Sequence, residues 1–294
     1  MKYCSAREPS NVVFIMLPGN PGNSKIYIDF MRCLHLLYNQ KVDVYGVNFL
    51  GHCEPSSEVF SLEDQIEYIR RQILSIKYDH PNAKIYLLCH SLGAFVGLRL
   101  ESLGDKIICL FPSIDDFKST FHARLMRPLY STIGLQIVAF LVFLTSFVPR
   151  AVRLYLTLLL EPRFTVDQAT LLSTEWDYRL IHNTLGLVRD ECKFIPPLDL
   201  SKFDRMTRND SSLNSKSSAL IDKCYFIFSP FDGWCSIETF RKLTTKYPEK
   251  LITREHIRKS DEGGIYLTDA EVPHGFVLGY NEEVAKLVHK IVGM

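Results

Sequence analysis

The sequence predicts an α/β fold, a doubly wound and mainly parallel sheet with an inserted apolar helical cap. Short runs of β-branched and apolar residues, each about the length of a buried parallel strand, recur along the chain. Helical stretches separate these runs, and such alternation is typical of a parallel sheet covered on both faces. The alternation stops between residues 112 and 222. We therefore expect one α/β domain with an insertion, and functional groups directly after strands.

Composition and charge exclude several classes of protein. The chain has 294 residues, 47% of them hydrophobic, and a formal net charge of +1, which argues against disorder and against a nucleic-acid partner. Its eight cysteines show no C-x-x-C spacing, which favours reduced thiols over disulfides or a zinc site. The N-terminal residues lack the apolar stretch of a signal peptide, which predicts a cytosol-facing protein. No cofactor, metal or obligate protein partner is implied.

The predicted elements follow one another in a regular order. The clearest helix spans residues 61–78 and begins with a capping box of Ser61 and Asp64. The predicted strands cover residues 12–17, 42–49, 84–89, 106–111 and 224–229, with 251–257 as a weaker last candidate.

These assignments divide the chain into a core and a cap. The α/β core is expected at residues 1–111 and 223–294, and the helical cap insertion at 112–222. Within the cap we expect an apolar, membrane-binding segment at 129–160 and a polar linker at 201–218.

The candidate nucleophile is Ser91, in the sequence C-H-S-L-G between a predicted strand and a predicted helix. A serine at such a sharp turn needs small residues two positions away on each side, because sheet and helix crowd together there. Gly93 meets this requirement, and Cys89 stands where the G-x-S-x-G pattern has its first glycine. The alternative is that Ser91 merely caps the helix 92–102. We interpret His90 as structural, because adjacent residues in a tight turn point in different directions.

Acyl transfer from an activated serine also requires hydrogen-bond donors for the developing oxyanion, usually two backbone N–H groups. The N–H of Leu92, directly after the serine, is one candidate. The second is expected from the PGNPG loop at 18–22, with Asn20 as the favoured residue. The alternative is a simple turn, since Pro-Gly and Asn-Pro pairs mark turns.

The candidate acid and base follow the serine in chain order. Asp232 lies in a turn after the strand 224–229, and His274 lies in a loop before the final amphipathic helix. There the carboxylate can orient the imidazole, which can take the serine proton and return it. The alternative for Asp232 is an ordinary Asp-Gly turn. Candidates in less suitable positions are Asp222, Asp261, His256 and His289, and the histidines interpreted as surface or packing residues are His35, His52, His80, His122 and His182.

Four motifs follow one another along the chain: PGNPGN, the CHSLG turn, the FDGWC turn and the VPHGF loop. In these motifs and in their order, the chain resembles the lipid-droplet-associated hydrolase family. The resemblance implies an α/β-hydrolase fold, localisation to lipid droplets and endoplasmic reticulum, and hydrolysis of stored neutral lipid such as sterol ester. Carried over by motif, it assigns Ser91 as nucleophile, Asp232 as acid and His274 as base. The sequence departs from the family at Cys89, where glycine is usual.

An uncharged stretch at residues 129–148 is followed by a Pro-Arg pair and a second apolar arm. The first arm is just long enough to span a bilayer. A spanning helix would place Ser91 and Asp232 on opposite sides of the membrane, which excludes that arrangement. We therefore predict a pair of apolar helices inserted from one side into a lipid surface. The alternative is a cap helix buried over the active site.

Together these observations predict a serine hydrolase that cleaves carboxylic esters of lipids, neutral lipid or sterol ester, at the droplet surface through a Ser-His-Asp triad. Its expected partners are the lipid ester and the cytosolic face of a lipid droplet or endoplasmic reticulum membrane. Two alternatives remain open. One is a thioesterase or acyltransferase with the same triad, and the other is a weakly active protein that organises the droplet.

Overall fold

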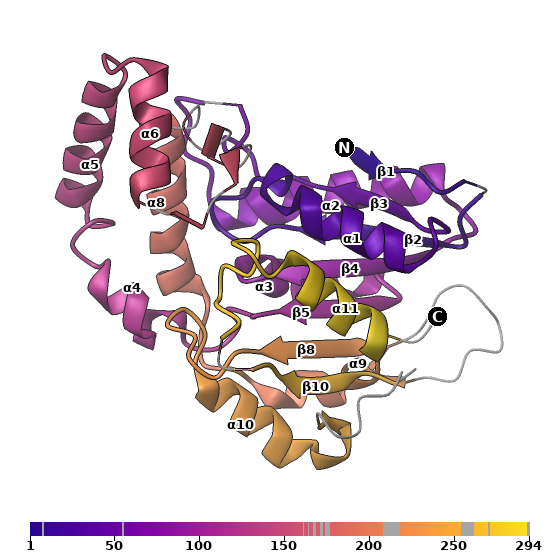
Figure 1. The fold of residues 1–294 in the computed structure, drawn as a ribbon. Coiled ribbons are helices and arrows are strands. Elements are labelled where there is room, and N and C mark those ends of the chain that lie inside the picture. The colour runs from indigo at the N-terminus through magenta and orange to yellow at the C-terminus, as the bar shows by residue number, and fades with distance from the viewer. Residues whose placement is uncertain are drawn as a thin grey trace.

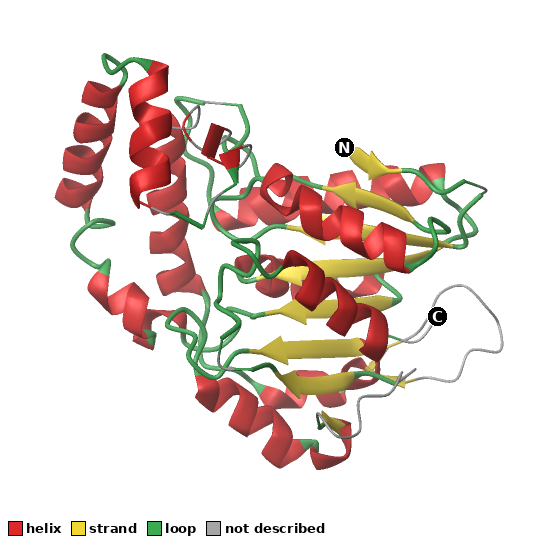
Figure 2. Ribbon diagram, in the orientation of Figure 1, coloured by secondary structure: helices red, strands yellow, loops and turns green. Residues whose placement is uncertain are grey.

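An eight-stranded sheet forms the centre of the molecule (Figures 1 and 2). The computed structural model describes the chain except for residues 8, 55, 161, 164, 167–168, 171–172, 174–176, 208–217, 254–261, 270 and 293–294. Across the sheet the strands lie in the order β1 (Lys2–Cys4), β3 (Asp43–Gly46), β2 (Val12–Leu17), β4 (Lys84–His90), β5 (Lys106–Leu110), β8 (Cys224–Phe228), β10 (Gly264–Leu267) and β9 (Leu251–Ile252). β1 is antiparallel to β3, and the other neighbours are parallel. The predicted sheet type is confirmed.

Helices cover both faces of this sheet. α1 (Ile28–Leu37) and α11 (Asn281–Ile291) pack together on the face nearer the viewer in Figure 1. The cluster on the other face includes residues of α2 (Leu62–Asp79), α3 (Leu92–Arg99) and α10 (Ile237–Lys246). Along β2, alternate residues belong to the two clusters, with Ile15 on the α2 side and Phe14 on the α1 side. A strand covered on both faces is therefore apolar at every position.

The observed elements depart from the predicted ones mainly at the sheet edges. The strand predicted at 42–49 is the shorter β3, and the candidate at 251–257 is a strand only over β9, with residues 254–257 outside the described part of the chain. β1 and β10 have no counterpart among the predicted strands. Both strands are too short to show periodicity, and β10 is defined by its parallel pairing with β8.

The predicted capping box at the start of α2 is confirmed. The Asp64 N–H donates to Ser61 Oγ at 3.2 Å, and the Ser61 N–H donates to Asp64 Oδ2 at 2.9 Å. The helix predicted at 92–102 is α3 followed by the short η2 (Glu101–Leu103). Other short elements of the core are η1 (Ser24–Tyr27), α9 (Leu220–Lys223) and η5 (Pro248–Lys250).

Four helices of residues 112–222 stand beyond the carboxyl ends of the central strands, where the arrowheads point in Figure 1: α4 (Phe121–Leu125), α5 (Thr132–Thr145), α6 (Arg150–Leu160) and α8 (Tyr178–Phe194). The same region contains η3 (Phe117–Ser119), η4 (Leu200–Asp204) and the two-stranded ribbon of β6 (Met206–Thr207) and β7 (Ser218–Ala219). α5 packs against α8. Most of the predicted polar linker, residues 208–217, lies outside the described residues. Among the described helices, none combines the length and the apolar composition needed to cross a membrane.

Candidate active site

The turn between β4 and α3 holds Ser91 in a strained backbone conformation. Ser91 has φ 51° and ψ −119°, a region that residues other than glycine rarely adopt. Its side chain makes no capping hydrogen bond to α3, so the alternative role of a helix cap does not hold. The strain instead presents the hydroxyl group at the carboxyl edge of the sheet.

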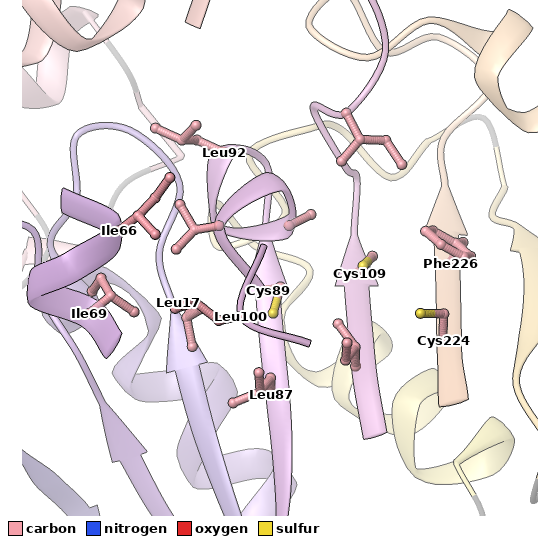
Figure 3. Packing of buried hydrophobic residues seen from close by; sticks show 14 of the residues in the cluster. Leu17, Ile66, Ile69, Leu87, Cys89, Leu92, Leu100, Cys109, Cys224 and Phe226 are labelled. Atoms are coloured by element: carbon pink, nitrogen blue, oxygen red, sulfur yellow. The ribbon is translucent and has the colours of Figure 1, made fainter. Parts of the chain in front are cut away.

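Close packing between this helix and the sheet explains the residues around the serine. A Cβ atom at Gly93 would lie 2.4 Å from the carbonyl oxygen of Leu17. A Cβ atom at Gly97, one turn further along α3, would lie 2.5 Å from Cys89 Sγ. Gly97 therefore leaves the space that the Cys89 side chain occupies, next to Leu17 on β2 and Cys109 on β5 (Figure 3). This packing is the physical reason why cysteine can replace the first glycine of the pattern.

The structure brings Ser91, His274 and Asp232 together in one chain of hydrogen bonds. Ser91 Oγ lies 2.9 Å from His274 Nε2, and His274 Nδ1 lies 2.7 Å from Asp232 Oδ2. The other carboxylate oxygen, Oδ1, accepts the backbone N–H groups of Trp234 at 2.8 Å and Cys235 at 3.0 Å. Burial by itself would raise the pKa of Asp232, but the nearby imidazole and these hydrogen bonds outweigh it and hold the pKa below its usual value. The carboxylate is therefore suited to orient an imidazole.

The competing acid and base that the structure describes lie away from Ser91. The Asp222 carboxylate pairs with Lys250 Nζ at 2.7 Å. His289 belongs to α11, where its ring packs edge-on against Tyr38. Asp261 and His256 fall outside the described residues.

The predicted oxyanion donors lie beside the serine. Leu92 is the first residue of α3, and the first N–H groups of a helix have no partner within it. The 18–22 loop runs directly over the nucleophile, because a Cβ atom at Gly19 would lie 2.8 Å from Ser91 Cβ. Asn20, the next residue, directs its side-chain amide toward α8, where Nδ2 donates to the carbonyl of Thr184 at 2.9 Å. Its backbone N–H stays the predicted second donor.

His90 connects the 18–22 loop to the loop that carries His274. The Gly19 N–H donates to Tyr27 Oη at 3.0 Å, and this hydroxyl lies 2.7 Å from His90 Nδ1. On the opposite side of the ring, Nε2 lies 2.9 Å from the carbonyl oxygen of His274. This arrangement suits a neutral imidazole with its proton on Nε2, which donates to that carbonyl while Nδ1 accepts the Tyr27 hydroxyl proton. Burial, followed by repulsion from His274, lowers the pKa of His90 to about 3 and keeps the ring neutral.

A neutral thiol and a second serine complete the floor of the site. Ser113 Oγ lies 3.2 Å from Ser91 Oγ, and Cys235 Sγ lies 3.7 Å from His274 Nδ1. One ligand atom each of Asp232, Cys235 and His274 falls within 4.8 Å of the others, a spacing that could hold a metal ion. Cys235 Sγ donates to the carbonyl oxygen of Phe111 at 2.9 Å, and His274 Nδ1 is held by Asp232 Oδ2 at 2.7 Å, so these ligand atoms are already engaged with protein partners. The donor set therefore suits a triad better than a metal centre.

A pocket of about 570 Å³ opens above Ser91 and His274. Most of the residues that line it are apolar, including Ile26, Phe117, Met126, Leu160, Leu180, Ile181, Val188, Val277 and Leu278. The lining also includes the polar residues Asn20, His52 and Glu191. Burial raises the pKa of Glu191 to about 8, while the hydrogen bond from Asn20 opposes it. Burial lowers the pKa of His52 to about 4, which the Pro21 carbonyl only partly offsets.

Sequence patterns missed three residues of this site. Tyr27 and Glu191 have no motif around them, and the interpretation of His52 as an ordinary surface or packing residue misses its place on the pocket wall. The only sequence signal for Glu191 is its position in α8, on the same helix face as the apolar Leu187 and Val188, which belong to the core.

Comparison with known proteins identifies the family. A family model described as "Lipid-droplet associated hydrolase" matches residues 10–277. The chain belongs to the lipid-droplet-associated hydrolase family. A relative of that name from Dictyostelium discoideum is 27% identical over 96% of this chain and 88% of its own length. The human relative is 22% identical over 97% of this chain and 85% of its own length.

Comparison with solved structures identifies the fold. A lipase-esterase related protein from Clostridium acetobutylicum matches with a TM-score of 0.55 and 13% identity, covering 98% of this chain and 97% of that protein. A haloalkane dehalogenase from Bradyrhizobium elkani matches with a TM-score of 0.61 and 12% identity, covering 97% and 90%. The family resemblance and the α/β-hydrolase fold expected from the sequence are thereby confirmed. The family's description supports a hydrolase whose family is associated with lipid droplets.

Proposed function

We propose that the protein is a serine hydrolase that cleaves carboxylic esters of lipids, neutral lipids or sterol esters, at the surface of lipid droplets. The observation that carries this proposal is the hydrogen-bonded chain from Ser91 through His274 to Asp232 at the floor of a largely apolar pocket. Apolar walls suit an acyl chain, and the strained serine suits attack on its ester carbonyl.

The proposed reaction has two halves. Ser91 Oγ attacks the ester carbonyl while His274 Nε2 takes its proton, and the oxyanion binds the N–H groups of Leu92 and Asn20. The imidazolium then protonates the leaving alcohol, which gives an acyl-enzyme. Water, activated by the same imidazole, attacks the acyl-enzyme and releases the fatty acid. Asp232 holds the imidazole in the tautomer that both halves require.

Labelling with a fluorophosphonate probe tests the nucleophile without assuming a substrate. Wild-type protein is expected to react covalently, and Ser91→Ala to lose the label. Ser229→Ala is the matched control, because Ser229 is also buried at the end of a strand but donates its hydroxyl proton to the carbonyl of Val272 at 2.6 Å. Failure of folded wild-type protein to react would contradict the proposal. It would favour a protein that organises droplets.

The droplet surface is the proposed site of action because an apolar face is exposed on α5. Large apolar side chains recur at the helical spacing of Ile133, Ile137, Phe140, Leu141 and Leu144, and all five are exposed. Exposed patches of this kind are uncommon on soluble proteins and mark lipid or protein contacts. Insertion of this face from one side would place the pocket next to a phospholipid monolayer.

Flotation with phospholipid-coated triolein droplets tests this surface. Ile137→Glu combined with Leu141→Glu is expected to abolish flotation, because two carboxylates would have to enter the acyl region. Leu36→Glu on α1 is the matched control, since Leu36 is 59% exposed and Leu141 is 55% exposed. Flotation of the double variant at the wild-type level would favour a cap helix that closes over the active site.

Cellular localisation follows from the same proposal. The protein is expected on droplets and on the cytosolic face of the endoplasmic reticulum. Protease added to intact microsomes should therefore degrade it, and protection of the chain would contradict the cytosolic placement.

A further inference from the structure

One wall of the active-site pocket carries buried polar groups that ester hydrolysis itself does not use. Glu191 on α8 is only 2% exposed and lines the pocket together with Ser91 and His274. Its carboxyl group accepts a hydrogen bond from Asn20 Nδ2 at 3.2 Å. The polar wall therefore joins α8 to the loop that lies over the nucleophile.

Several polar atoms of this wall lack a hydrogen-bond partner among the described residues. They are Asn20 Oδ1 and the ring nitrogens of His52, which approach the Pro21 carbonyl without a hydrogen bond of ordinary geometry. His52 is 2% exposed, and its ring packs under the 18–22 loop, because a Cβ atom at Gly22 would lie 2.9 Å from His52 Cγ. Buried polar groups without a partner are rare and unfavourable, since they have lost their hydrogen bonds to water. A bound molecule that supplies hydrogen bonds here would remove part of this cost.

The protonation states indicate what kind of group would bind. With its pKa raised to about 8, the Glu191 carboxyl carries a proton at neutral pH and offers an O–H donor beside its acceptor oxygen. With its pKa lowered to about 4, His52 is neutral, with one N–H donor and one acceptor nitrogen, and the Pro21 carbonyl lies near the ring. Neutral donors and acceptors side by side match a hydroxyl group, whereas an ionic headgroup would stay uncompensated in such a buried place.

The remaining lining restricts where this hydroxyl group can lie. Ile26, Leu180, Val188 and Leu278 present hydrocarbon to the pocket and suit an acyl chain. An ester whose alcohol part carries no further hydroxyl group, such as a sterol ester, would leave the polar atoms of this wall without hydrogen-bond partners. Sites built to hydrogen-bond a substrate hydroxyl discriminate strongly against analogues that lack it.

We propose that the pocket selects long-chain esters that carry a free hydroxyl group close to the scissile bond, with Glu191 and His52 as specificity-determining residues. A monoacylglycerol is the simplest ester of this class. The inference rests on the proposed ester hydrolysis and narrows its substrates away from sterol esters.

The test compares two esters of one fatty acid, the monoacylglycerol and the ethyl ester, presented in the same detergent micelles. Wild-type kcat/KM is expected to be roughly tenfold higher for the monoacylglycerol, the effect of about two hydroxyl hydrogen bonds. Glu191→Leu should bring this ratio close to one, and Glu191→Gln, which keeps a neutral donor and acceptor, should preserve most of it. His52→Phe provides a second variant, in the part of the wall under the 18–22 loop. Glu283→Leu, at an exposed position of α11, is the matched control.

Two results would overturn the inference. One is a wild-type ratio near one, and the other is a ratio that Glu191→Leu and His52→Phe both leave unchanged while fluorophosphonate labelling of Ser91 persists. If neither ester is cleaved and Ser91 is not labelled, the proposed hydrolysis is wrong. A binding measurement then tests separately whether the polar wall binds a hydroxyl group. A 1-O-alkylglycerol ether should change the fluorescence of Trp234, which lines the pocket, at lower concentration than its dimethoxy analogue. Equal affinity for the two ethers would refute the hydroxyl-binding wall.

Discussion

Replacement of Tyr27 by phenylalanine tests the link between the two loops of the active site. Tyr27 is 4% exposed, and its hydroxyl group accepts the Gly19 N–H at 3.0 Å and lies 2.7 Å from His90 Nδ1. The substitution leaves both partners buried without a hydrogen bond, and each such group costs about 1–3 kcal/mol. The substitution also removes a buried hydroxyl group, and the loss of its desolvation cost offsets part of this effect. The net free energy of unfolding is therefore expected to fall by about 2–4 kcal/mol. Urea unfolding at constant m-value measures this change.

The same substitution at Tyr38 provides a matched control. Tyr38 is also 4% exposed, but its buried hydroxyl group has no hydrogen-bond partner among the described residues. Tyr38→Phe should therefore leave the stability nearly unchanged or raise it. Equal losses in the two variants would refute the reasoning, because they would attribute the cost to packing. If the two loops are held through His90, Tyr27→Phe should also slow fluorophosphonate labelling of Ser91, and Tyr38→Phe should not.

Three further predictions concern the triad, the buried acid and the turn. Asp232→Asn should lower kcat by about 10⁴-fold with the fold intact, because the amide favours the wrong imidazole tautomer, and a loss below tenfold would contradict the triad. The pKa of Glu191 is about 8 in the folded protein, and its ordinary value is 4.5. Between these pH values the native state binds more protons than the unfolded state, so wild-type protein loses stability as the pH rises. The free energy of unfolding of Glu191→Gln minus that of wild type should therefore rise by up to about 1.4 kcal/mol per pH unit across this window. Urea unfolding of both proteins at pH 5 and at pH 7.5 measures this difference. The same difference at both pH values would show that the acid is ionised in the native state. Gly93→Ala should destabilise the fold by at least about 2 kcal/mol, because its Cβ atom would lie 2.4 Å from a backbone oxygen, whereas Gly275→Ala, whose nearest contact is 3.6 Å, should be tolerated in the same assay.

Local patterns in the sequence determined the central strands and the positions of the candidate triad. β2, β4, β5 and β8 are buried on both faces, so the positions between their ends are apolar and the runs stand out from the polar segments between them. Because parallel strands all end at one edge of the sheet, residues directly after strands gather there. Ser91 and Asp232 follow such strands, and the structure places both within hydrogen-bond distance of His274.

The tertiary structure alone decided which other groups meet this triad. The contact between Asn20 and Glu191 joins positions 171 residues apart, and no local pattern encodes such a separation. β10 is likewise a strand because β8 lies beside it. A sequence pattern records whether a position is buried, since burial requires apolar residues at a regular period. The partner of a buried polar group, and therefore its pKa, depends on how distant segments pack, as the neutral Glu191 and His90 illustrate.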